Sequence, residues 1–71
     1  MTQQIQKQIS EIEKDLESIK GKLALNRQKL KMMGANTLIF ERNRQKLVVD
    51  VLTMAVSDKE EELSELKSIL V

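Results

Sequence analysis

The first half of the chain carries apolar residues at a regular spacing of four and three positions. This spacing is a 3.5-residue repeat sustained over about four heptads, which is typical of helices that pack side by side along a seam. Polar Gln, Glu, Lys and Ser residues occupy most of the positions between. The pattern predicts a helix over about residues 3–33 with a seam made of Ile5, Ile9, Ile12, Leu16, Ile19, Leu23, Leu30 and Met33.

One position of this seam is polar, because Asn26 falls where the repeat would place an apolar side chain. An asparagine there is typical of a helix that leaves its partner at this level, or of a hydrated edge of the seam. The alternative is a buried polar residue that fixes the register of two helices at a cost in stability. The sequence leaves these interpretations open.

The two glycines differ in their surroundings. Gly21 lies on the side farthest from the seam, and the apolar repeat continues through it. We therefore expect an exposed helical glycine that costs about 1 kcal/mol relative to alanine. Gly34 suits the left-handed position that follows a helix end, and Asn36 and Thr37 then offer side chains that cap a helix N-terminus. These signals predict a turn at residues 34–36.

The second half predicts a helix over about residues 37–70 that is apolar on two sides. Its second apolar face consists of Leu47, Val51 and Met54. A helix with two apolar sides needs more than one neighbour, so we expect the first helix on one side and a second chain on the other. The stripe expected to meet the first helix is Leu38, Gln45, Val49, Leu52, Val56, Lys59, Leu63, Leu66 and Leu70.

Two alternatives concern this second half. Residues 37–52 are rich in β-branched side chains, which favour strands, so two strands joined by "ERNRQK" are an alternative to the helix. Ser57 and Glu60 form a capping box, which marks helix starts. A break near residue 57 is therefore a second alternative.

The sequence as a whole predicts an all-α fold of one domain, residues 1–71. We expect an antiparallel helical hairpin that dimerises into a four-helix bundle, because so short a chain buries little surface by itself. The expected core of this oligomer is Ile5, Ile9, Ile12, Leu16, Ile19, Leu23, Leu30, Leu52, Val56, Leu63 and Leu66.

Charge is segregated along the chain although the net charge is only +1. Residues 1–19 sum to −2, residues 20–46 to +7 and residues 47–71 to −4. Folded about Gly34, the chain becomes a rod of about 45 Å with a basic turn end and an acidic open end. The basic candidate contact residues are Lys20, Lys22, Arg27, Lys29, Lys31, Arg42, Arg44 and Lys46.

This segregation has two interpretations. Two hairpins paired antiparallel would set +7 against −6, so the charges would orient self-assembly, although exposed charges are screened beyond about 10 Å. Alternatively the basic end contacts nucleic acid or an acidic protein. Phe40 is the only aromatic residue, and no nucleic-acid reading motif is present. The heptad explains the apolar residues of the basic helix, so we expect no membrane binding.

The composition argues against an enzyme. The chain has no cysteine and no histidine, which removes thiolate chemistry and the commonest base near neutral pH. Asp58, Glu61, Glu62 and Glu65 could share helix faces, and we interpret them as a solvated acidic surface. We therefore expect no cofactor and no metal.

The expected function is a non-enzymatic protein–protein interaction module, such as an adaptor, assembly factor or regulator. Its expected partner is itself, with another protein docked on "LVVDVLTMAV" as a further alternative. A nucleic-acid-binding regulator that uses the basic end is the second hypothesis. The sequence starts without a signal pattern and has no apolar run near 18 residues, so we expect a cytoplasmic protein. Chains of this kind are common among phage and bacterial accessory proteins.

Overall fold

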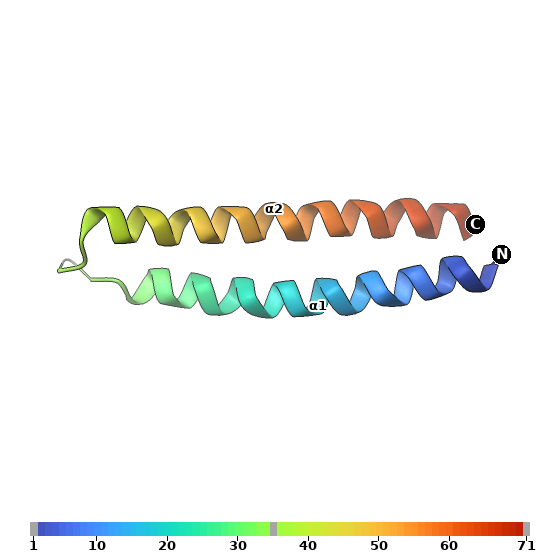
Figure 1. Cartoon of the computed structure of the whole chain (residues 1–71), viewed down its shortest axis with the longest axis horizontal. Coiled ribbons are helices and arrows are strands. Elements are labelled where there is room, and N and C mark those ends of the chain that lie inside the picture. Colours follow the sequence, from blue (N-terminus) through green and yellow to red (C-terminus); the bar gives the residue numbers. More distant parts are fainter. Residues whose placement is uncertain (1, 35, 71) are drawn as a thin grey trace.

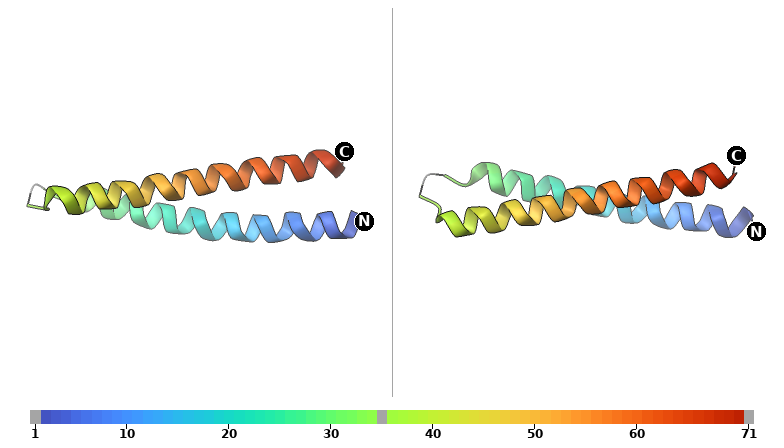
Figure 2. Two further views of the ribbon diagram at one scale, coloured as in Figure 1. Left: turned by 45° about the horizontal axis from the view of Figure 1, so that its top comes forward. Right: turned by 90° about the horizontal axis from the view of Figure 1, so that it is seen from above.

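The computed structural model describes residues 2–34 and 36–70, which form two helices, α1 (Thr2–Met32) and α2 (Ile39–Leu70). The helices run antiparallel, with both chain ends at one end of the molecule and the connection at the other (Figure 1). Further views show the helices crossing at a shallow angle (Figure 2). The all-α helical hairpin predicted from the sequence is confirmed.

Helix α2 is continuous from Ile39 to Leu70. The alternative of two strands over residues 37–52 is therefore wrong, and so is the alternative of a break near residue 57. Ser57 lies between Val56 and Lys59, which both keep the seam spacing and are both half-buried. A capping box only needs its residue types three positions apart, so the same letters also occur within a helix whose packing continues.

The connection between the helices is longer than the predicted turn at residues 34–36, because α1 ends at Met32 and α2 begins at Ile39. Residue 35 lies outside the described residues. The main-chain N–H of Met33 donates to the carbonyl of Leu30 at 3.2 Å, which tightens the end of α1. The N–H of Thr37 donates to the carbonyl of Gly34 at 3.0 Å and closes the turn.

Two details of the predicted caps are wrong. Gly34 does not adopt a positive φ, so α1 ends with the tightened turn at Met33 and without a left-handed glycine. The carbonyl of Leu38 accepts from the N–H of Arg42 at 3.1 Å, which makes Leu38 the N-cap residue of α2. Asn36 and Thr37 instead belong to the connection that carries the chain across to the second helix.

The core of the molecule is the contact between the two helices. The buried side chains among the described residues are Ile9, Ile12, Leu16 and Leu23, all from α1 and only 6–8% exposed. No described residue of α2 is buried. The Cα atoms span 55 Å along the long axis and 14 Å across, so the rod is longer than the predicted 45 Å because the connection adds to two helices of 31 and 32 residues.

Candidate interaction surface

A polar layer interrupts the apolar seam near the turn. Both Asn26 and Gln45 are half-buried, and they meet across the seam. The Nε2 of Gln45 donates to the carbonyl oxygen and to the Oδ1 of Asn26, each at 3.0 Å. The Nδ2 of Asn26 donates to the carbonyl of Lys22 at 2.8 Å. Asn26 therefore lies within the contact between the two helices, and its side chain is hydrogen-bonded to both of them.

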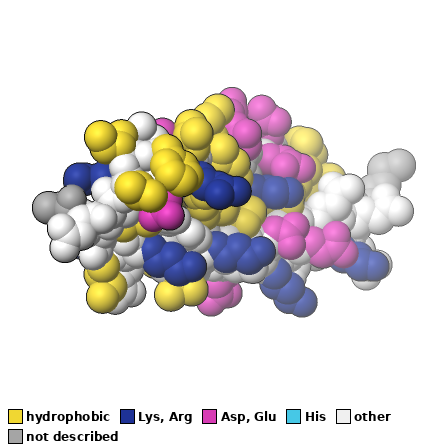
Figure 3. All heavy atoms as spheres, turned by 60° about the vertical axis from the view of Figure 1, so that its left-hand side comes forward, with side chains coloured by type: hydrophobic (Ala, Val, Ile, Leu, Met, Phe, Trp, Pro, Cys, Tyr) yellow, Lys and Arg dark blue, Asp and Glu magenta, His cyan; other side chains and the backbone are white. Residues whose placement is uncertain are grey.

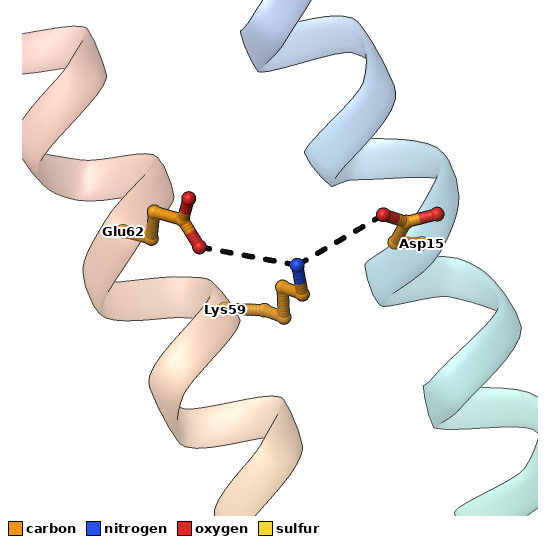
Figure 4. A network of polar contacts seen from close by, with 3 residues as sticks. All are labelled: Asp15, Lys59 and Glu62. Carbon is orange, nitrogen blue, oxygen red and sulfur yellow. Dashed lines mark ion pairs between the residues drawn. The ribbon is translucent and has the colours of Figure 1, made fainter.

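Lys59 forms a second polar position in the seam. Its Nζ lies 3.9 Å from a carboxylate oxygen of Asp15 on α1 and 3.9 Å from one of Glu62 on α2 (Figure 4). On the opposite flank of the hairpin, Lys20 lies 3.7 Å from Glu60. The side chains of these ion pairs are between 34% and 62% exposed, so each contributes roughly 0.2–1 kcal/mol at most.

The second apolar face of α2 lies outside the contact with α1. Leu47, Val51 and Met54 are 64%, 63% and 66% exposed, although they are large aliphatic side chains. Hydrophobic side chains gather at the surface over α2 beside lysine and arginine (Figure 3). Their position away from α1 agrees with the sequence pattern, which placed them beside the stripe that meets the first helix.

A groove runs beside this face. It has a volume of about 460 Å³, and its walls come from both helices. The cationic side chains of Lys22 and Arg44 belong to its lining, and aliphatic side chains make up most of the remainder. The lining residues are Lys22, Asn26, Arg44, Leu47, Val48, Val51 and Leu52. The groove and the second apolar face thus form one surface with positive charge at its edges.

The predicted basic residues extend beyond the turn end of the rod. Each of the eight is exposed, but Lys20 lies twelve residues before the end of α1, which is about 18 Å along a helix. Its ion pair with Glu60 places it near the middle of the molecule. The basic region is therefore the turn-side half of the hairpin, from Lys20 and Lys22 to the connection and on to Lys46.

The predicted oligomer-core residues all lie on the α1–α2 contact of a single hairpin. Four are buried, as described above, and the other seven are half-buried. Their role in an oligomer stays a prediction, because one chain already uses them for its own seam. The half-buried members are Ile5, Ile19, Leu30, Leu52, Val56, Leu63 and Leu66.

Acidic side chains cover the outer surface of α2 beyond the second apolar face. Asp58, Glu61, Glu62 and Glu65 line a shallow depression there. Within residues 2–34 and 36–70, no cluster of three or more acidic, cysteine or histidine side chains has the arrangement of a metal site. In the same residues, neither helix has a stretch long and apolar enough to cross a membrane.

Comparison of the chain with known protein families, with curated proteins and with solved structures gave no match. Any functional argument therefore rests on the surface described above.

The contact between Asn26 and Gln45 was not predicted from the sequence. Both residues stand out as polar members of otherwise apolar stripes, and that signal could have suggested their pairing. Which residues face each other across the hairpin depends on the length of the connection, and the connection is longer than the turn that the sequence predicts. For the same reason, the ion pair between Lys59 and Asp15 does not follow from the sequence.

Proposed function

We propose that this chain is a small non-enzymatic protein–protein interaction module that self-associates, with two hairpins forming a four-helix bundle. One observation carries the proposal: the hairpin leaves the apolar side chains Leu47, Val51 and Met54 of α2 more than 60% exposed. Contiguous exposed apolar patches mark interaction sites when they exceed a few hundred Å². A module of this kind would act as an adaptor, assembly factor or regulator, with the cytoplasm as its expected compartment.

The energetics support a second hairpin as the partner that covers the second apolar face. The four buried side chains among the described residues make a thin core, and chains below about 70–80 residues usually add a staple or an oligomer contact. Complete burial of an aliphatic side chain contributes about 1.5–3 kcal/mol. Three partly exposed side chains from each copy would thus contribute on the order of 6–12 kcal/mol. That amount is comparable to the cost of association, about 4–15 kcal/mol.

Sedimentation equilibrium of the purified chain tests this proposal. We expect a mass of twice the 8.2 kDa of one chain. Circular dichroism on the same samples reports whether the chain is helical at each concentration. A mass of one chain in a helical sample at several hundred micromolar would show that the hairpin is complete without a second copy.

A nucleic-acid-binding regulator is a second candidate, and the exposed basic half favours it. All eight predicted basic residues are exposed, and among the ion pairs of the described residues only Lys20 of this set takes part. Arg27, Arg42 and Arg44 are the strongest phosphate-binding candidates, because guanidinium groups bind phosphate in a bidentate manner.

A salt titration with a generic duplex DNA and a generic RNA tests this candidate. Phosphate contacts give an affinity that falls steeply with salt, with a slope of about 0.9 per contact on a double-logarithmic plot for duplex DNA. The variant Arg42→Gln/Arg44→Gln should have a shallower slope, whereas the matched control Lys7→Gln/Lys14→Gln at the open end should not. Absence of binding at about 50 mM salt would exclude this function.

A further inference from the structure

The order of side chains along the outer surface of α2 is self-complementary. Arg44, Val51 and Asp58 are spaced by seven residues, so they follow one line along the helix with a drift of only about 20° per heptad. All three are exposed. Arg44 and Asp58 take part in none of the ion pairs among the described residues. A cation and an anion thus flank an apolar centre at equal distances of about 10.5 Å.

From this order we infer that the second apolar face binds a second copy of this chain, with the two α2 helices antiparallel and a twofold axis at Val51. The inference rests on the self-association proposed above and adds its surface, orientation and register. A twofold axis makes an interface in which the same patch meets itself. With the axis at Val51, Arg44 of each copy lies at the same height as Asp58 of the other and within about 20° of the line through Val51.

The alternative orientation is unfavourable for the same residues. Two parallel α2 helices in register would set Arg44 against Arg44 and Asp58 against Asp58. Like charges directly opposed are destabilising, whereas each antiparallel pair is favourable. The antiparallel arrangement also places the basic half of each hairpin beside acidic side chains of the other, because Glu61, Glu62 and Glu65 follow directly after Asp58.

The groove beside the face fits the same partner. Its lining combines aliphatic side chains with the cations Lys22 and Arg44, so it suits an apolar segment that ends in acidic residues. The α2 helix is such a segment, because Leu47, Val51 and Met54 precede Asp58. The required area is modest: an interface of standard size buries roughly 800 Å² per partner, which is about one seventh of the 5865 Å² accessible surface.

Charge reversal tests the register directly. The single variants Arg44→Asp and Asp58→Arg each place like charges at both symmetric contacts, and each should raise the dimer dissociation constant about tenfold at low salt. The double variant Arg44→Asp/Asp58→Arg should have a dimer dissociation constant within about twofold of that of the natural chain. The control Lys46→Asp carries the same change in charge two residues from Arg44, on another side of the helix, and should have less than a twofold effect.

A cysteine cross-link tests the axis without altering these charges. The natural chain has no cysteine, so a single introduced thiol reports only on its own position. Val51→Cys should form a covalent dimer on mild oxidation, because the two Val51 positions meet at the axis, where Cα atoms can approach the 4.4–6.8 Å that a disulfide requires. The control Thr53→Cys, on the opposite flank of α2, should form little disulfide-linked dimer under the same conditions.

The outcomes separate this inference from the proposed function. If the natural chain has the mass of one hairpin, self-association itself fails, and the second apolar face belongs to another partner. If the chain dimerises but the charge swap restores nothing, or Val51→Cys couples no faster than Thr53→Cys, the interface proposed here is wrong while self-association stands. Recovery by the double variant together with selective coupling at position 51 supports the inference.

Discussion

The two halves of the hairpin use the same helical repeat but place their apolar side chains differently. In the open-end half, Ile9, Ile12 and Leu16 are 7–8% exposed within the seam, and the outer surface of α2 is acidic. In the turn-side half, Asn26 and Gln45 put a polar layer in the seam, while large aliphatic side chains of α2 face outward. The buried apolar residues of the open-end half therefore stabilise the hairpin itself, although Ile69 near the chain ends is 64% exposed. In the turn-side half, by contrast, a whole apolar face of α2 lies outside the contact with α1.

This difference indicates separate roles for the two halves. A seam of isoleucine and leucine holds the helices together but offers nothing to a partner once it is buried. An outward apolar face stabilises little within one chain, and this is the surface on which the proposed self-association rests. The comparison predicts that substitutions in the open-end seam unfold the hairpin, whereas substitutions on the outer face of α2 affect association.

The largest effect is expected from Ile12→Asp or Leu16→Asp. Either change removes about 1.5–3 kcal/mol of apolar burial and places a carboxylate in the seam, where an unpaired charge adds several kcal/mol. The total exceeds the roughly 3–5 kcal/mol that one small core supplies. We expect loss of most helicity by circular dichroism and loss of the oligomer by sedimentation.

The matched control for this change is Ser10→Asp, which adds the same charge to the same helix at an exposed position. It should retain the helicity of the natural chain. If Ile12→Asp stays helical and dimeric, the seam identified here does not hold the hairpin together.

Much of the fold could be predicted because the seam of α1 repeats without interruption from Ile5 to Leu23. The residues from Ile5 to Leu23 fix a helix and one contact face, and Gly34 marks the only place where the pattern changes register. The sequence predicts the start of α2 two residues too early because Asn36 and Thr37 are good N-cap residues. A cap contributes only about 1 kcal/mol, and the chain needs those residues to cross from one helix to the other.

The candidate site was predictable only in part. The exposed position of Leu47, Val51 and Met54 follows from the two-sided pattern of α2, since only one side can meet α1. The polar contacts across the seam depend on which residues lie at the same height, and a two-residue error in the start of α2 shifts every such pair. The contact between Asn26 and Gln45 therefore does not follow from the sequence pattern alone.

A smaller effect is expected from the polar layer of the turn-side half. Asn26→Ala and Gln45→Ala should each lower the free energy of unfolding by about 1 kcal/mol, because Asn26→Ala removes the Oδ1 acceptor of Gln45 and Gln45→Ala removes the donor of both contacts across the seam. The double variant should lose less free energy of unfolding than the sum of the two single losses, and the difference, which is the coupling energy, should be about 0.5–1.5 kcal/mol. Urea unfolding of the four chains measures this coupling.

Asn43 provides the control for this cycle, because it lies two residues from Gln45 and is exposed. The pair Asn43→Ala and Gln45→Ala should be additive within about 0.3–0.5 kcal/mol. Equal coupling in both cycles would mean that the polar layer contributes nothing specific to the register of the helices.

The smallest effect is expected at Gly21, where the two halves join. A Cβ placed there has no heavy atom within 4 Å beyond its own helix, and the residue lies within α1. Gly21→Ala should therefore raise the free energy of unfolding by about 0.5–1 kcal/mol. The reverse change Ala24→Gly, at an exposed position of the same helix, should lower it by a similar amount in urea unfolding.

The concentration dependence of thermal unfolding tests most directly whether the outer face of α2 holds two copies together. Association that favours the folded state makes the midpoint rise with chain concentration. We predict such a rise for the natural chain and for the exposed control Thr53→Asp, and a lower midpoint that does not vary with concentration for Val51→Asp. A midpoint independent of concentration in the natural chain, or an equal rise in Val51→Asp, would show that the outer face of α2 does not hold two copies together.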